Sequence, residues 1–360
     1  MDDASTPETM THIPEKREST HGSFTAVAIV SLIAFLVPVF FIPFTGAPLQ
    51  FSKTLLVVIA TALLYGMFVL MSMRRAEVVK YWSIPLVLFS LLPVVYVITA
   101  TFSESPVRSF FGYQLETDTF GFMLLAVLFT NAIVLLVHRT QLGTILKTAL
   151  VASWIVFAFQ LVQVVSGAIS GGGIVGTVTT NTLGRWNDFG MFAGLVGALS
   201  LLTLFALRVR GVAKLALTAT YLIAIFFLAL VNFTEAWILF GIVSFGLFAL
   251  LFVQIGSSSE GEIKFSALVL PAVGTLAALF FVFLGGGAAS ALQDTFGVPP
   301  FEVRPSVAGT VEALQQTYRE TPTLGSGPNT FASQWLQHRD GTVLNTIFWN
   351  TEFNVGSGVI

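Results

Sequence analysis

The chain has 360 residues, of which 55% are hydrophobic and only 10% are charged, and its mean hydropathy is +0.84. A soluble domain carries about 25% charged residues, because much of its surface must face water. The composition therefore excludes a soluble enzyme and a disordered chain, and the net charge of −2 argues against a nucleic-acid-binding protein. Cysteine is absent and the four histidines are scattered, so we expect no disulfide, no bound metal and no cofactor.

Charged residues are confined to short intervals between long apolar stretches, and none lies between Glu18 and Lys53. A helix needs about 20 apolar residues to cross the core of a bilayer. The pattern predicts an all-α, polytopic membrane protein with nine spans, at about 24–44, 54–73, 83–102, 119–137, 148–167, 189–207, 215–232, 236–254 and 266–285.

The positive residues predict the direction in which the chain crosses the membrane. Nine Lys and Arg lie in the loops 74–82, 138–147, 208–214 and 255–264, and only three lie in the alternate short loops. The positive-inside rule places the first set in the cytoplasm together with the N-terminus. Four regions follow from this topology: a disordered cytoplasmic tail (1–23), a transmembrane bundle (24–285), a large external loop (286–345), and the start of a tenth span (346–360) at which we expect the chain to be cut off.

Two external connections contain charged residues that are candidates for a binding site. The connection 103–118 places Arg108 beside Glu104, Glu116 and Asp118, either as an ordinary polar loop or as the lip of an external site.

The connection 168–188 is rich in Gly and Thr and ends with Arg185, Asn187 and Asp188 at the start of the sixth span. A helix N-terminus and an arginine both favour a phosphate, although a surface ion pair and a helix cap explain the same residues.

Two further polar features lie at or within the predicted spans. Glu235 follows the seventh span and is either an acid that faces a cavity or a residue that favours the start of the next helix. Gln160 and Gln163 share one face of the fifth span, where hydrogen bonding between helices is the simpler interpretation.

The large external loop contains a predicted helix followed by a tight turn. Val307, Val311, Leu314 and Tyr318 recur on one face of a helix over 306–320, which Pro322 ends. Arg304 precedes this helix, Arg319 closes it, and the turn LGSGPNTF (324–331) is of the kind that lets backbone approach a ligand. An amphipathic helix that only caps the bundle is the alternative interpretation.

Three sequence patterns follow one another in the external segments. They are S-x-x-x-x-x-S-x-x-G in the connection 103–118, G-R-x-N-D-x-G at the start of the sixth span, and R-P-S…T-x-x-x-L…P-x-L-G-x-G-P-x-x-F in the large loop. Together they resemble the O-antigen ligase and O-antigen polymerase (Wzy-like) superfamily of bacterial surface-glycan enzymes. The best single match is the segment 322–331, and the resemblance implies a divergent or C-terminally truncated member.

The resemblance implies a GT-C-like helical bundle in a bacterial-type cytoplasmic membrane, with its active face outside. Such an enzyme transfers a glycan from an undecaprenyl-diphosphate-type lipid to a hydroxyl of an acceptor glycan, lipid or protein. The resemblance implies substrate-facing roles for Arg185, Arg304, Arg319, Gly325 and Gly327. We add Asn187, Asn329, Trp349 and Asn350 as further substrate-binding candidates, and we assign Glu235 or Asp188 to proton transfer.

The chain departs from the family pattern at two places. Residues 234–237 (TEAW) contain no arginine where the family has a Ser-Arg-Gly-type motif, and Trp349 stands where the family has His. Two other functions therefore stay open: a flippase or other transporter, and a non-catalytic relative in a glycan assembly complex. The absence of charge from the middle of the predicted spans favours surface chemistry over transport.

Overall fold

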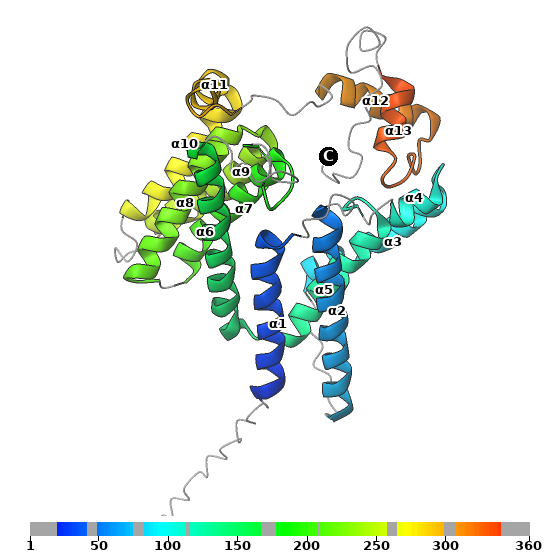
Figure 1. Cartoon of the computed structure of the whole chain (residues 1–360), viewed down its shortest axis with the longest axis horizontal. Coiled ribbons are helices and arrows are strands. Elements are labelled where there is room, and N and C mark those ends of the chain that lie inside the picture. The colour runs from blue at the N-terminus through cyan, green and yellow to red at the C-terminus, as the bar shows by residue number, and fades with distance from the viewer. Residues whose placement is uncertain are drawn as a thin grey trace, which may run out of the picture.

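A computed structural model describes residues 20–41, 49–74, 83–112, 116–166, 178–179, 181–207, 209–257, 265–298 and 307–339 (Figure 1). Within these residues every regular element is a helix, which confirms the all-α prediction. The α-helices are α1 (Thr20–Val39), α2 (Leu49–Arg74), α3 (Ile84–Thr101), α4 (Pro106–Phe111), α5 (Phe120–Leu136), α6 (Leu142–Ser166), α7 (Trp186–Ala206), α8 (Val212–Val231), α9 (Thr234–Ser257), α10 (Val269–Phe283), α11 (Gly286–Thr295), α12 (Val307–Glu320) and α13 (Phe331–His338), and the 3-10 helices are η1 (Arg139–Gln141) and η2 (Phe265–Leu268).

Each of the nine predicted spans coincides with an apolar helix, and six of these helices are long and apolar enough to cross a bilayer. They are α2, α3, α6, α7, α8 and α9. The apolar parts of α1 (Phe24–Val39) and α5 (Phe120–Leu136) are shorter. The described residues therefore support an integral membrane protein with six or seven candidate spans, and the count of nine stays a prediction.

The seventh candidate span is α10 together with α11, and it is broken rather than straight. The two helices meet at an angle of 94° around Gly285. A Cβ at Gly285 would lie 2.5 Å from Cα of Phe281, so glycine permits the close approach at this corner. The sequence predicts a span over 266–285 followed by an external loop, whereas the chain turns at Gly285 and continues as α11, which packs on α8.

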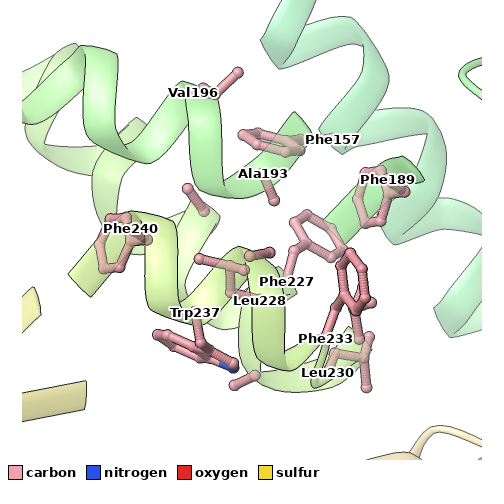
Figure 2. Close-up of a cluster of buried hydrophobic side chains, with 14 of the residues drawn as sticks. Phe157, Phe189, Ala193, Val196, Phe227, Leu228, Leu230, Phe233, Trp237 and Phe240 are labelled. Carbon is pink, nitrogen blue, oxygen red and sulfur yellow. The ribbon is translucent and has the colours of Figure 1, made fainter. Parts of the chain in front are cut away.

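The largest core joins α6, α7, α8, α9 and α10 around aromatic side chains (Figure 2). Phe157, Phe189 and Phe227 form one group of ring contacts, and Trp237 stacks on Phe281 with 4.7 Å between ring centroids. Small residues on α7 let its backbone approach α8 and α9, as small residues do between membrane helices. This core fixes the start of α7, where the predicted phosphate site lies.

A smaller core joins α1, α2 and α5 and centres on Ala26, Leu64 and Ala132. Many of the large apolar side chains outside both cores are exposed, for example Leu88 and Val95 of α3 and Leu250 and Val253 of α9. Exposed apolar side chains on long helices are expected where lipid replaces water as the solvent.

The predicted regions at the two ends of the chain lie largely outside the described residues. Helix α1 begins at Thr20, so the tail predicted over 1–23 ends in helix, and residues 1–19 are not described. The start of a tenth span, predicted over 346–360, also falls outside the described residues. Within the large loop, the helix predicted over 306–320 agrees with α12.

Candidate functional site

The connection after α3 and the turn between α12 and α13 lie against each other, although more than 200 residues separate them in the sequence. The Ser103 hydroxyl donates to the Ser326 carbonyl at 2.8 Å, and the Ser109 hydroxyl lies 2.7 Å from the Pro328 carbonyl. The two serine hydroxyls are also 2.7 Å apart. The first and third patterns of the family resemblance therefore meet through hydrogen bonds.

Two glycines allow this close contact. Gly327 has a φ of +98°, and a Cβ at this position would lie 2.4 Å from Cβ of Ser103. Gly112 has a φ of +63°, and a Cβ there would overlap the Glu116 carboxylate and lie 2.9 Å from the Asn329 side-chain nitrogen. From its sequence, the Gly-rich turn is expected to approach a ligand. At Gly327, however, the turn approaches Ser103 of the same chain.

A buried carboxylate holds the centre of this contact. Glu116 is 2% exposed, and its Oε2 accepts a hydrogen bond from Nδ2 of Asn329 at 3.0 Å. Asn329 has a φ of +55°, a left-handed conformation that asparagine adopts more readily than most residues. Two further hydrogen bonds flank the carboxylate, from Arg108 Nη1 to the hydroxyl of Ser333 at 3.2 Å and from Gln334 to Glu104 at 3.3 Å.

Asp118 lies beside this carboxylate and shares its surroundings. The pKa of Asp118 is raised to about 6, chiefly by burial and also by the negative charge of Glu116, while a hydrogen bond to its own backbone and the Arg108 guanidinium act in the opposite direction. Among the described residues, Oδ1 of Asp118 is buried and accepts no hydrogen bond. The sequence predicts that these acids and Arg108 line the lip of a site, and the structure brings Glu116, Asp118 and Arg108 together.

A second polar group forms where α7 begins. The Asp188 carboxylate accepts a hydrogen bond from the backbone N–H of Arg185 at 2.8 Å, and so caps the helix from within its first turn. The Asn181 side chain accepts from the backbone N–H groups of Leu183 and Gly184 and orders the approach to the helix. Asp188 therefore has a structural role, as in the cap interpretation, although the capping residue is not Asn187.

The segment before α7 is tied to the ends of α1 and α2. The Thr182 hydroxyl donates to the Pro38 carbonyl at 2.8 Å, and the Lys53 ammonium donates to the Val37 carbonyl at 2.5 Å. Lys53 also interacts electrostatically with Asp188. In the sequence, Lys53 bears only on the predicted topology. Its proximity to Asp188 depends on tertiary structure and leaves no signal in the sequence.

The segment 168–188 has one further anchor in α6. Gln160 and Gln163 are both fully buried, and Nε2 of Gln160 donates to the Val178 carbonyl at 2.7 Å. From the sequence, both glutamines are expected to form hydrogen bonds with a neighbouring helix. For Gln160, the partner is instead backbone of the connection that leads to Arg185.

The remaining predicted site residues are not gathered into one constellation by the described structure. Arg185 is exposed at the start of α7, and Glu235 is exposed in the first turn of α9. Arg319 is exposed near the end of α12, where it borders a shallow depression of about 340 Å³ lined by apolar side chains of that helix. Arg304, Trp349 and Asn350 lie outside the described residues.

Neither a metal site nor a known relative identifies the chemistry. Across the described parts of the chain, no three His, Asp or Glu side chains gather as metal ligands would. Comparison of the chain with protein-family models, curated proteins and solved structures found no match. Any proposal about function therefore rests on the residues themselves.

Proposed function

We propose that the protein is a membrane glycosyltransferase that moves a glycan from a lipid-diphosphate donor to an acceptor hydroxyl. The proposal includes a nine-span, GT-C-like bundle with the N-terminus in the cytoplasm and the active face outside. The observation that carries it is the contact between the segments 103–112 and 326–330. Two patterns of the O-antigen ligase and polymerase resemblance thus belong to one structural unit, as parts of a single site would.

The chemistry of the reaction requires positive charge near the leaving diphosphate. Arg185 is exposed at the N-terminus of a 21-residue helix, where the helix dipole also favours an anion. The Lys53 ammonium lies close to the same helix start. Fixed cations in a partly dry site stabilise the charge that develops as the anomeric C–O bond breaks. Arg304 and Arg319 are the further candidates in the large loop.

The placement of charge supports surface chemistry over transport. In the described helices α1 to α10, every charged residue lies within two turns of a helix end, as Lys53, Asp188 and Glu235 do. A transporter is expected to hold its substrate near the middle of the bilayer, and the middle parts of these helices carry no charged residue. The external connections, by contrast, hold two carboxylates, Glu116 and Asp118, next to Arg108.

The proposal is tested by donor turnover in reconstituted vesicles. We expect vesicles that contain the purified protein to convert a fluorescent, lipid-diphosphate-linked glycan into a product attached to an added acceptor glycan. Arg185→Ala should lower the rate by about 100-fold or more, the range seen when one charge-stabilising donor is removed. Arg139→Ala is the matched control. Arg139 is also exposed at the start of a helix, but in the proposed topology it lies on the cytoplasmic side, away from the active face.

The outcomes separate the three candidate functions. Full activity in Arg185→Ala would show that this arginine does not hold the diphosphate. Movement of the donor across the bilayer without a glycosylated product would favour the transporter. Binding of donor with neither movement nor product would favour a non-catalytic relative.

A further inference from the structure

Helix α3 presents a continuous apolar stripe to its surroundings. Among the six described helices that are long and apolar enough to cross a bilayer, α3 has the smallest share of buried residues. Its exposed apolar side chains recur at intervals of three and four residues, which places them on one face: Leu88, Leu91, Val95, Ile98 and Phe102. Because a helix of this length and composition lies in the bilayer, lipid is the solvent that surrounds this stripe.

The apolar surface continues past the end of α3 onto α4. Phe102, which follows the last residue of α3, is 71% exposed. Val107 and Phe111 lie four residues apart on one side of α4, and they are 76% and 58% exposed. The Phe110 ring of the same helix packs edge-on against Phe120, the first residue of α5, with 5.3 Å between ring centroids. Helix α4 therefore lies at the depth where one apolar helix ends and the next begins.

The opposite side of α4 binds helices α12 and α13 and the turn between them, which we call the α12–α13 unit. Residues two positions apart in a helix point to nearly opposite sides, because each residue turns the chain by about 100°. Ser109 is two residues from both Val107 and Phe111, and its buried hydroxyl lies 2.7 Å from the Pro328 carbonyl of the turn. Val107 and Phe111 therefore face away from the α12–α13 unit.

The charged side chains of this connection are directed toward the α12–α13 unit as well. Nη1 of Arg108 donates to the Ser333 hydroxyl at 3.2 Å, and the Glu104 carboxylate accepts a hydrogen bond from Gln334 at 3.3 Å. Both partners belong to α13. Hydrogen-bonded polar groups thus lie on one side of α4 and exposed apolar groups on the other, which is the pattern of a helix that lies in a membrane interface.

We propose that α4 lies in the membrane interface and seats the α12–α13 unit on the membrane surface where α3 ends. Val107 and Phe111 contact lipid at the boundary between headgroups and acyl chains, which the apolar side of such a helix enters by about 5–10 Å. Figure 1 shows α4 at the end of α3, with α12 and α13 beyond it. Lipid is the occupant because the exposed side of α4 continues the lipid-facing stripe of α3. The proposal concerns the position of these helices and does not depend on which reaction the protein performs.

The absence of cysteine allows single nitroxide labels to be placed in the full-length protein. Val107→Cys and Phe111→Cys are labelled, reconstituted in phospholipid vesicles, and measured for collision with oxygen, which concentrates in lipid, and with a nickel chelate, which stays in water. Ile98→Cys is the lipid reference. Ser105→Cys is the water reference, because Ser105 is exposed at the start of α4 but on the side of Ser109. We expect the oxygen-to-nickel ratio at both test positions to approach the lipid reference and to exceed the water reference by about threefold or more.

Two results would overturn the proposal. A ratio at both test positions equal to the water reference would show that this side of α4 faces water. Low collision rates with both reagents would show that protein, such as a second copy of the chain, covers it. Gln337→Cys tests the orientation, because Gln337 is exposed on α13 and should resemble the water reference, whereas a value like the lipid reference would show that α4 is not the seat. If either labelled variant does not fold, Phe102→Cys reports on the same apolar surface.

Discussion

Gly327→Ala tests the contact between the segments 103–112 and 326–330 most sharply. The added Cβ would lie 2.4 Å from Cβ and 2.5 Å from Oγ of Ser103, well inside the separation that two side chains tolerate. Relief requires the two segments to move apart, which would break the hydrogen bonds from Ser103 to the Ser326 carbonyl and from Ser109 to the Pro328 carbonyl. Each lost hydrogen bond costs about 1 kcal/mol, and an alanine at positive φ costs about 1–2 kcal/mol. The contact between the two segments should therefore lose about 3–4 kcal/mol of stability.

The matched control is Gly325→Ala in the same turn. Gly325 also has a positive φ, +64°, but an added Cβ would only touch the Tyr318 ring at 3.9 Å. This variant carries the backbone strain without the collision, so it should cost about 1–2 kcal/mol. The difference between the two variants therefore reports the contact with Ser103, not the loss of a glycine.

Hydrogen exchange followed by mass spectrometry measures the effect locally. We expect peptides from 103–112 to lose protection in Gly327→Ala by about 30-fold or more relative to Gly325→Ala, because each 1.4 kcal/mol changes an opening equilibrium tenfold. Peptides from α7 and α8 should exchange as in the parent. Equal exchange of 103–112 in the two variants would refute the contact.

The remaining predictions concern the bundle. Gly274→Ala should lower the melting temperature in detergent, because its Cβ would lie 2.3 Å from the Tyr221 hydroxyl, whereas Gly246→Ala meets nothing within 4 Å and should leave the melting temperature unchanged or slightly raised. A similar melting temperature for both variants would contradict the tight packing of α8 on α10. Gln160→Leu removes one hydrogen bond, which lowers stability, and it also removes a buried side-chain oxygen that accepts no hydrogen bond in the described structure, which raises stability. Because the two effects oppose each other, global stability should change by less than about 1 kcal/mol. It should nevertheless speed proteolysis near Val178, and unchanged proteolysis would show that this hydrogen bond does not hold the segment.

The helices are the part of the fold that the sequence predicts well. A span of about 20 apolar residues between charged intervals has no other stable state in a bilayer, so composition alone locates α2, α3 and α6 to α9. The helix α12 was predictable for a different reason, because its apolar residues recur at the helical period. The corner between α10 and α11 was not, since a glycine at 285 leaves room for the last turn of α10 but does not specify a corner, and α11 is placed by its packing on α8.

The candidate site was predictable in its parts but not in its assembly. The charged cluster at 104–118 and the Gly-rich turn at 324–331 are each visible in the sequence. Their contact is made largely by serine hydroxyls and backbone carbonyls, as from Ser109 to Pro328, and neither group has a sequence signature that names its partner. The same limit applies to Lys53, whose position near Asp188 depends on the packing of α1, α2 and α7.

The residues of the turn also acquire a different interpretation. From the sequence, Gly325, Gly327 and Asn329 are expected to face a substrate. In the structure, Gly327 contacts Ser103, and Asn329 donates to the Glu116 carboxylate and, more weakly, to the Arg108 carbonyl. These contacts hold the two segments together, whereas Arg185 and Arg319 are exposed.

The most direct test of the proposed function is product formation by the purified protein in vesicles supplied with a lipid-diphosphate-linked glycan and an acceptor. We predict a glycosylated acceptor together with a released lipid diphosphate in equal amounts, and the loss of both products in Arg185→Ala but not in Arg139→Ala. Donor that crosses the bilayer intact, or donor that is left unchanged by a correctly folded protein, would contradict the proposal.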